Sequence, residues 1–402
     1  MKIETPVLRF RSTKEKRVSQ GYLWAFRNEL DFREKDHAPG SLVRVESAKG
    51  RPLGFGFLNT QANLCFRMLA RPGEMDGEAD LEGMIRERIL RAIAWREERM
   101  PSSQARRLFF SEGDGLSGLI ADQYRDALVL QFSSFAMDRH RDLVLETFKK
   151  VLKLRVVVER SEGGSRLKEG LEPKTGVLWS DGSLDEATLS HHPIEDGGLK
   201  FELDLLKGQK TGFFIDQRDT RALVASLAKG KTCLDMFCHT GALALSLAKG
   251  GAASVLGVDE SEAALKLAAR NAELNGLKAT FEASDAFKSL RAMSDQGRSF
   301  DLVVLDPPSM TSNRASLGDA LRGYKELNLR ALKLLPAGGI LVSCSCTQAV
   351  SEDDFLTTIQ SAAVDAGARI QELFRLGQPE DHPRHPAMPE TRYLKVRVFR
   401  KI

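Results

Sequence analysis

Apolar runs alternate with amphipathic stretches through the second half of the chain. The run over residues 302–305 is wholly apolar and is typical of a buried strand in a parallel sheet. The predicted strands cover residues 199–205, 232–237, 254–259, 280–283, 301–306, 339–344 and 393–399, and the predicted helices cover residues 219–227, 241–249, 262–274, 317–335 and 352–366. Strands that alternate with helices predict an α/β fold with a doubly wound, mainly parallel sheet.

The first part of the chain has a different pattern, in which short β-rich runs are broken by Gly and Asn. Residues 7–10 and 41–45 alternate between apolar and polar positions, and residues 54–58 and 64–69 are rich in β-forming side chains. One helix is predicted at residues 21–29. These elements together predict a small N-terminal β-barrel.

The region between these two parts predicts an α+β domain. Its predicted helices cover residues 81–100 and 137–152, and its predicted strands cover residues 107–111, 118–123, 127–133 and 155–159. Residues 161–190 are polar and rich in Gly, and are predicted as loop. The pattern therefore predicts three domains, at residues 1–73, 74–190 and 191–402, in an α/β multidomain protein.

The composition is that of an ordinary globular protein. The chain has no apolar run of about 18 residues, and Met1 to Pro6 lack the apolar segment of a signal peptide, so neither a membrane span nor a secreted protein is expected. Its five cysteines form no even disulfide framework. A cytoplasmic location is the expectation that follows.

Charge is distributed unevenly along the chain. Residues 1–72 contain fourteen Lys and Arg and seven Asp and Glu, a net charge of +7, so the remainder carries −3 of the total of +4. A basic module on a mildly acidic body favours an anionic partner, with nucleic acid as the leading case. A solvated basic face without a partner is the alternative.

Carboxylates end or follow four of the predicted strands: Asp235, Asp259, Asp285 and Asp306. The carboxyl ends of parallel strands meet at one edge of the sheet, where such folds bind ligands. In a nucleoside-binding fold, the acid after the second strand (Asp259) accepts from ribose hydroxyls, and an acid near the third (Asp285) can accept from an adenine amino group. Each Asp alone could be a helix cap, but four in register favour a binding site.

The loop after the strand at residues 232–237 indicates which nucleoside is bound. It contains a single glycine, Gly241, whereas a dinucleotide fold needs G-x-G-x-x-G to hold a pyrophosphate, and no P-loop lysine follows. The site therefore suits a ligand without phosphates, such as S-adenosylmethionine. This arrangement resembles class I methyltransferases more than dinucleotide-dependent oxidoreductases.

A closer resemblance extends over the whole chain. In the N-terminal domain, Arg17, Gly21 and Trp24 followed by residues 40–43, 54–59 and 67–69 resemble a PUA domain, an RNA-binding pseudo-barrel. The other segments that carry the resemblance are residues 211–218, the Asp-x-Phe-x-x-Thr-Gly of residues 235–241, residues 306–308 and 343–346, and the tail residues 381–383, 389–390 and 393–395. Together they look very like the RlmI type of large-subunit ribosomal RNA (cytosine-5)-methyltransferase, which has a PUA domain, a middle α+β domain and a C-terminal methyltransferase domain.

This resemblance implies S-adenosylmethionine as cofactor. It also implies large-subunit (23S) ribosomal RNA as partner, bound through the basic N-terminal domain and the catalytic cleft. The cofactor-binding residues that follow are Phe213, Gln217, Arg218, Asp235, Phe237, Thr240, Gly241, Asp259, Asp285 and Asp306. A helix entry with core phenylalanines is the alternative for residues 213–218. No metal and no membrane are implied, and a homodimer is left open.

Carbon 5 of cytosine does not react with a methyl sulfonium unless a nucleophile first adds to carbon 6, and a Cys thiolate is suited to that addition. Cys344 and Cys346 lie at the end of a predicted strand. By its distance from Gly338 and Gly339, Cys346 falls where RNA cytosine-5 methyltransferases carry the attacking Cys. Cys344 is predicted to pack in the strand, and a C-x-C metal site is disfavoured because no second Cys pair exists.

Asp306 is the second predicted catalytic residue, with the role of binding the N3/N4 edge of a flipped cytosine. Many RNA cytosine-5 enzymes have a second Cys after the proline of this motif, whereas this chain has Ser309, and the base that takes the C5 proton is left open. Two alternatives remain. One is a methyltransferase acting on an exocyclic or ring nitrogen, although Ser309 is a poor substitute for the aromatic residue that usually follows Asp/Asn-Pro-Pro there. The other is a non-catalytic RNA-binding assembly factor.

Overall fold

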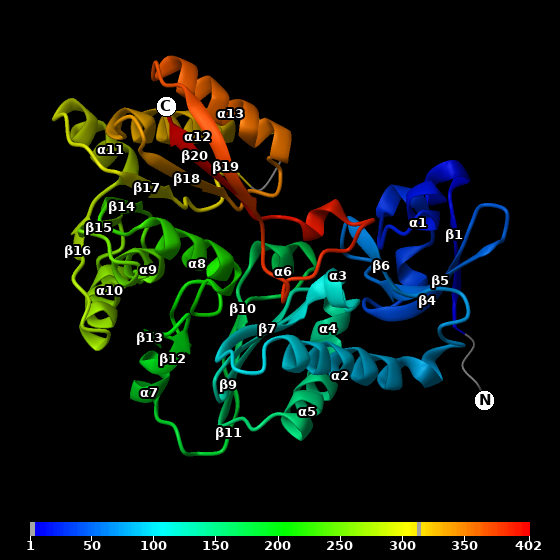
Figure 1. Cartoon of the computed structure of the whole chain (residues 1–402). Helices are drawn as coiled ribbons and strands as arrows, with labels where there is room; N and C mark the ends of the chain where they lie inside the picture. The colour runs from blue at the N-terminus through cyan, green and yellow to red at the C-terminus, as the bar shows by residue number, and fades with distance from the viewer. Residues whose placement is uncertain (1–4, 312–314) are drawn as a thin grey trace. The chain divides into compact units, whose positions relative to one another are not determined.

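The computed structural model describes residues 5–311 and 315–402, and within them the chain divides into two compact units. The first unit comprises the described residues up to Ile194, together with Leu203–Ile215 and Glu380–Thr391. The second comprises Glu195–Glu202, Asp216–Pro379 and Arg392–Ile402. Figure 1 shows the chain coloured from blue at its N-terminus to red at its C-terminus.

The first unit begins with a six-stranded sheet in the order β2-β6-β5-β4-β1-β3. Its strands are β1 (Val7–Phe10), β2 (Trp24–Phe26), β3 (Leu30–Asp31), β4 (Ser41–Glu46), β5 (Pro52–Leu58) and β6 (Leu64–Ala70), and the short helix α1 (Lys16–Ser19) follows β1. β1 pairs with β4 in parallel, whereas the other pairs are antiparallel. The predicted β-rich N-terminal domain is confirmed.

The helix predicted at residues 21–29 is wrong. Residues 24–26 form β2, in which Trp24 lies opposite Arg67 and Ala25 opposite Phe66 of β6. The backbone amide of Arg27 donates to the carbonyl of Asn63 at 2.8 Å. Long-range pairing thus supplies the backbone hydrogen bonds that a helix would make locally, and it overrides the weak helical preference of this segment.

The first unit continues with a five-stranded sheet in the order β11-β10-β9-β8-β7. Its strands are β7 (Ala105–Phe110), β8 (Leu119–Tyr124), β9 (Ala127–Phe132), β10 (Val156–Ser161) and β11 (Lys174–Ser180), and its helices are α2 (Leu81–Arg99), α3 (Ser111–Asp114), α4 (Phe135–Arg139), α5 (Arg141–Val151), α6 (Gly164–Lys168) and α7 (Glu186–Ser190). Residues 161–190 are therefore not all loop as predicted. Most side chains of β11 are exposed, although Leu178 and Trp179 pack against the core, and the strand pairs in antiparallel with β10.

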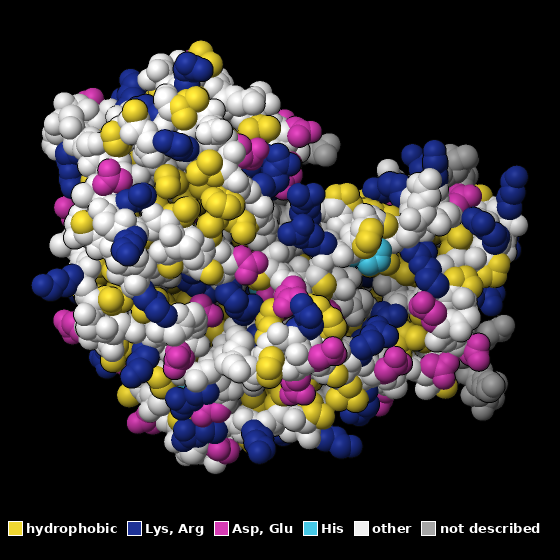
Figure 2. Space-filling view, viewed as in Figure 1, with side chains coloured by type: hydrophobic (Ala, Val, Ile, Leu, Met, Phe, Trp, Pro, Cys, Tyr) yellow, Lys and Arg dark blue, Asp and Glu magenta, His cyan; other side chains and the backbone are white. Residues whose placement is uncertain are grey.

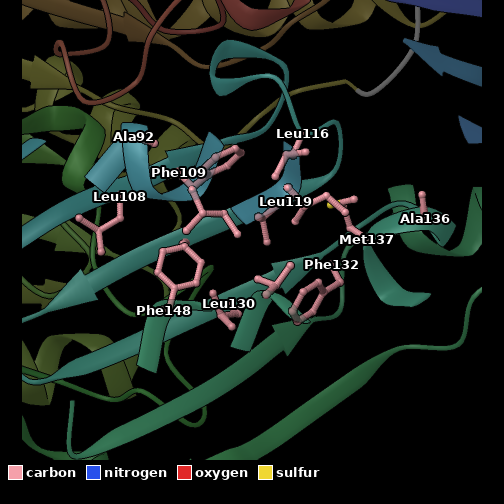
Figure 3. Close-up of a cluster of buried hydrophobic side chains, with 14 of the residues drawn as sticks. Ala92, Leu108, Phe109, Leu116, Leu119, Leu130, Phe132, Ala136, Met137 and Phe148 are labelled. Atoms are coloured by element: carbon pink, nitrogen blue, oxygen red, sulfur yellow. The ribbon is translucent and has the colours of Figure 1, made fainter. Parts of the chain in front are cut away.

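One hydrophobic cluster unites the two sheets of the first unit. It includes Phe55 and Phe57 from the N-terminal sheet and Phe109, Leu130 and Phe148 from the following elements. Figure 3 shows the last three of these among the buried side chains. The two regions share a core, and the boundary expected near residue 73 stays a prediction.

The second unit is built on a seven-stranded sheet in the order β16-β15-β14-β17-β18-β20-β19. Its strands are β14 (Thr232–Met236), β15 (Ser254–Asp259), β16 (Thr280–Ala283), β17 (Leu302–Leu305), β18 (Ile340–Ser345), β19 (Ile370–Leu376) and β20 (Lys395–Lys401). β14 to β18 pair in parallel, and β20 is antiparallel to both of its neighbours. This confirms the predicted mainly parallel sheet.

Helices cover both faces of this sheet (Figure 1). They are α8 (Arg218–Leu227), α9 (Ala242–Lys249), α10 (Glu262–Leu274), α11 (Ala286–Asp295), α12 (Leu317–Leu334) and α13 (Glu352–Asp365). Residues of α11, α12 and α13 share one buried cluster with the strands, and residues of α8 and α9 share another. The remaining elements are the hairpin β12 (His192–Asp196) and β13 (Leu199–Leu203) and the 3₁₀ turns Ser12–Glu15, Arg27–Glu29, Glu34–Asp36, Glu78–Asp80, Ile215–Gln217 and Pro389–Thr391.

The pattern of apolar residues does not predict α11 or β19. Most side chains of β19 are exposed, so the strand shows no apolar alternation and depends on pairing with β20. No helix within the described ranges is both long and apolar enough to cross a membrane.

Candidate active site

The carboxyl ends of the parallel strands form one edge of the seven-stranded sheet. From β14 the chain adds β15 and then β16 on one side, whereas β17 pairs on the other side of β14, so the order reverses between β14 and β17. Open α/β sheets bind ligands beyond such a reversal. Asp235 in β14, Asp259 at the end of β15 and Asp306 after β17 all belong to this edge.

Asp235 is a buried carboxyl group whose oxygens accept no hydrogen bond of normal geometry within the described part of the chain. Its side chain is 0 % exposed, and neither carboxyl oxygen has a hydrogen-bond partner among the described residues. Burial raises its pKa well above the usual range, the charges of Asp306 and Asp259 raise it further, and the nearby backbone N–H of Ala244 lowers it. Such a group is costly to keep unless a ligand supplies a donor or a positive charge.

Asp259 fastens the loop that follows β14 to the end of β15. One carboxylate oxygen accepts from the His239 amide at 2.9 Å, and the other accepts from the Ser261 amide at 3.0 Å. These bonds fix the orientation of the carboxylate and leave acceptor capacity on both oxygens. The predicted contact of Asp259 with ribose hydroxyls is compatible with this arrangement and stays a prediction.

The loop after β14 has an unusual backbone. Phe237 and His239 adopt positive φ angles of 68° and 49°, a region that residues other than glycine seldom occupy. Gly241 has a φ of 83°, and a Cβ there would lie 3.1 Å from the Cβ of Ala268. The carbonyl of the buried Thr240 accepts from Asn271 of α10 at 3.2 Å. Packing thus holds the loop in a strained shape, as is common at ligand-binding sites.

The predicted cofactor-binding residues near the start of α8 have different surroundings. Gln217 is buried and donates from Nε2 to Asp306 Oδ2 at 2.8 Å, so the structure brings these two together. Arg218, the first residue of α8, lies 3.8 Å from the Asp196 carboxylate. Phe213 belongs to the first unit, where its carbonyl accepts from the Tyr124 hydroxyl at 3.3 Å. Its predicted cofactor contact stays a prediction.

For Asp285 the sequence allows either a helix cap or a contact with the adenine, and the structure shows the helix cap. It is the N-cap of α11, and its carboxylate accepts from the Lys288 amide at 2.8 Å. The side chain is exposed, so its second oxygen can still bind a donor. The cap and the predicted adenine contact are therefore compatible.

Cys346 lies just beyond β18 and opposite the segment after β17. Its thiol contacts the carbonyl of Pro307, with Sγ 3.8 Å from the oxygen, and it is the partly exposed member of the five cysteines. Cys344 is fully buried, and burial raises the pKa of its thiol well above the usual range. The structure thus separates one accessible thiol from one that packs in the core.

Thr347 joins the loops of this edge, and the sequence gives no signal for it. Its hydroxyl accepts from the Met310 amide at 3.0 Å and lies 2.8 Å from the Tyr324 hydroxyl of α12. Its carbonyl accepts from the Lys395 ammonium of β20 at 3.0 Å. The register between β18 and β20 brings Lys395 to Thr347, and the contacts with Met310 and Tyr324 come from the loop after β17 and from α12, so no local sequence pattern reveals the group.

The donors and acceptors at this edge fit S-adenosylmethionine. Three carboxyl groups, those of Asp235, Asp259 and Asp306, gather where the strand order reverses, and the first has no partner among the described residues. Carboxylates suit a ligand with ribose hydroxyls, an ammonium and a sulfonium, and would repel a pyrophosphate.

We predict opposite effects on stability for two aspartates of the sheet. Because the folded-state pKa of Asp235 is raised, its favourable contribution is complete below the unfolded pKa near 4 and is lost as pH rises. Asp235→Asn should therefore raise the unfolding temperature of the ligand-free protein at pH 7, with little effect at pH 3, and should weaken cofactor binding.

Asp301 is the control for this experiment, because its pKa is shifted in the opposite direction to that of Asp235. Hydrogen bonds from Thr232 lower its pKa, so its contribution is present above the unfolded pKa and is lost in acid. Asp301→Asn should lower the unfolding temperature at pH 7. Differential scanning fluorimetry across pH, with calorimetric titration of S-adenosylmethionine, measures both effects. A less stable Asp235→Asn protein at pH 7 would contradict the interpretation of Asp235 as an unpaired acid.

A cavity of 550 Å³ lies elsewhere, within the first unit. Arg71, Arg88, Trp95 and Glu112 are among the residues that line it, and none of the predicted site residues does. The volume of a cavity is therefore a poor guide to the chemistry here. The strand-edge carboxylates and Cys346 define the candidate site.

Comparison with known proteins agrees with this geometry. The S-adenosylmethionine-dependent methyltransferase family matches residues 161–400, and the PUA-like domain family matches residues 8–71. Curated relatives named ribosomal RNA large subunit methyltransferase I, from Shewanella denitrificans and Shewanella frigidimarina, are each 37% identical over 399 residues and cover 98% of both chains.

Solved structures agree on the fold. A protein of Streptococcus mutans described as a SAM-dependent methyltransferase has a TM-score of 0.83 at 20% identity, covering 99% of this chain and 100% of that one. The methyltransferase SMU.776, complexed with SAH, has a TM-score of 0.84 at 21% identity with the same coverage. The chain belongs to the S-adenosylmethionine-dependent methyltransferase family, with an N-terminal PUA-like domain, and it is related over its full length to the ribosomal RNA large subunit methyltransferase I group.

Proposed function

We propose that the chain transfers the methyl group of S-adenosylmethionine to carbon 5 of a cytosine in large-subunit ribosomal RNA, with the thiolate of Cys346 as nucleophile. The observation that carries this proposal is the partly exposed thiol of Cys346 beside the segment that begins at Asp306. The names of the curated relatives and the PUA-like domain favour ribosomal RNA as the substrate.

The proposed reaction proceeds in three steps, of which Cys346 carries out the first and the last. The Cys346 thiolate forms a bond to carbon 6 of cytosine, and the electron pair of the C5–C6 double bond makes carbon 5 nucleophilic. The bound cofactor supplies the methyl group to carbon 5 and keeps the electrons of its broken carbon–sulfur bond. Carbon 5 then loses its proton to a base, the double bond forms again, and the thiolate leaves.

In this proposal, Asp306 holds the base during these steps. An ionised carboxylate accepts hydrogen bonds, and the exocyclic amino group of cytosine donates them. Gln217 donates to Oδ2 at 2.8 Å, and this bond helps to orient the carboxylate. Asp306 directly follows β17 and precedes Pro307 and Pro308, so the backbone that carries this carboxylate is restricted on both sides.

The N-terminal domain is suited to the phosphate backbone of the RNA. Its excess of Lys and Arg is spread over the surface, where Figure 2 shows these side chains in dark blue. Arg9, Arg11 and Arg33 have largely exposed side chains. Such contacts give affinity that weakens as salt is added, and base pairing or loop shape must supply the sequence preference.

Release of tritium tests the proposed reaction at carbon 5. Ribosomal RNA labelled with [5-³H]cytidine should release one tritium into water for each methyl group transferred, because the C5 hydrogen is lost in the reaction. Mass spectrometry of nuclease fragments then locates the methylated nucleotide. Methyl transfer without release of tritium would instead support the alternative reaction at a nitrogen atom. No transfer to RNA, despite binding of the cofactor, would support the assembly factor.

A further inference from the structure

Lys395 is a buried lysine at the same end of the sheet as Cys346. It is the first residue of β20, is 3 % exposed and pairs with Ser345, the residue before Cys346. Its ammonium donates to the carbonyl of Thr347 at 3.0 Å and to the carbonyl of Tyr393 at 2.8 Å. The chain around Cys346 is thus fastened to β20 through a charged group.

A lysine in this position is costly. The ammonium loses its water and receives two neutral carbonyls in return, and no carboxylate among the described residues forms an ion pair with it. Burial lowers the pKa of Lys395 to about 8, while the charges of Glu352 and Cys346 raise it and Arg392 lowers it. Lys395 is therefore mostly protonated at neutral pH. A methionine would fill the same space without this cost, so stability alone does not account for the lysine.

The other charged or titratable groups near Cys346 and Lys395, in the part of the chain that the structure describes, include Arg392, whose positive charge acts on Lys395. Asp306, after β17, is acidic. The negative charge of Glu352 in α13 raises the pKa of Lys395. Burial raises the pKa of Tyr324 in α12 to about 12, so it stays neutral, and Cys344 stays a thiol. A thiolate at Cys346 would be opposed by Asp306 and favoured by Lys395.

We propose that Lys395 is a positioning residue for Cys346, whose buried ammonium fixes the loop that carries the thiol and favours its thiolate form. The catalytic importance of this contact rests on the proposed function, whereas the effect on the thiol does not. Lys395 itself does not touch the substrate, because its ammonium is enclosed and engaged by two carbonyls.

The reactivity of the thiol tests this inference without methyl transfer. We expect iodoacetamide to alkylate Cys346 ahead of the four buried cysteines, and a Cys346→Ala protein identifies the signal. In Lys395→Met, the pH at which alkylation is half-maximal should rise by about one unit, and the rate at pH 7 should fall about tenfold. Lys395→Arg should recover most of the rate because it restores the charge. Peptide mass spectrometry measures each rate.

Lys401 provides a matched control on the same strand. Its ammonium also donates to two backbone carbonyls, those of Leu332 and Leu335, but at the opposite end of β20. Lys401→Met likewise removes two hydrogen bonds to backbone carbonyls and should leave the alkylation profile unchanged, and thermal unfolding checks that both variants are folded. An unchanged profile in Lys395→Met, or an equal shift in Lys401→Met, would overturn the inference. Methyl transfer by Cys346→Ala would instead overturn the proposed function and leave the effect on the thiol standing.

Discussion

Replacing Cys346 with alanine is expected to abolish methyl transfer, with a loss of at least about 10⁴-fold in rate. Without the thiol, nothing adds to carbon 6 and carbon 5 stays unreactive. The variant should bind S-adenosylmethionine and RNA with affinities close to those of the wild type, because Cys346 is not among the groups expected to bind the cofactor. Single-turnover assays with labelled cofactor measure the rate, and calorimetric titration measures the affinities.

A trapped adduct makes this test independent of slow turnover. RNA that contains 5-fluorocytidine should become covalently attached to the wild-type enzyme, because fluorine at carbon 5 cannot leave as the proton does. Cys346→Ala should form no adduct. The control is Cys344→Ala, which removes a buried thiol two residues away and should still form the adduct. An adduct in Cys346→Ala and none in Cys344→Ala would exchange the two roles.

The largest expected effect on stability comes from Arg96 in the first unit. Its guanidinium is 1 % exposed and binds both oxygens of Asp114 at 2.7 Å. It also donates to the carbonyls of Arg107 and Asp381 at 3.1 and 2.9 Å. Arg96→Met should lower the free energy of unfolding by about 3–5 kcal/mol, because it leaves the Asp114 carboxylate without its bidentate partner.

Tryptophan fluorescence during urea unfolding measures this loss in the unit concerned. The three tryptophans of the chain, at positions 24, 95 and 179, all belong to the first unit. Arg99→Met is the control, because Arg99 and its partner Glu380 are both exposed, and it should cost less than about 1 kcal/mol. Equal losses in the two variants would show that the buried ion pair adds no stability.

The sequence pattern predicts the strands and helices whose own side chains are apolar and buried. β15 and β17 are apolar runs that lie inside the sheet, and the pattern finds their observed cores, Ser254–Asp259 and Leu302–Leu305. β11 and β19 have mostly exposed side chains and exist because a neighbouring strand pairs with them. Residues 24–26 were expected in a helix for the same reason, since their strand partner is about 40 residues away in the sequence.

In the candidate site, too, some residues can be predicted from the sequence and others cannot. Asp259, Asp306 and Cys346 can be predicted because parallel strands bring their carboxyl ends to one edge. The bond between Gln217 and Asp306 and the contact between Lys395 and Thr347 depend on register and on loop geometry. Local patterns carry no information about these, although the tail segment with Lys395 is part of the family resemblance.

The position of β20 has a consequence for biosynthesis. This strand lies between β18 and β19, yet it comes from residues 395–401, which a ribosome makes after every other strand of the sheet. Until those residues emerge, β18 and β19 have open edges that can pair wrongly or with other chains. The loop with Cys346 also lacks its lysine until then. The thiol acquires its final surroundings only after residues 395–401 have been made, so a nascent chain without them would carry the cofactor edge but no fully formed reactive centre.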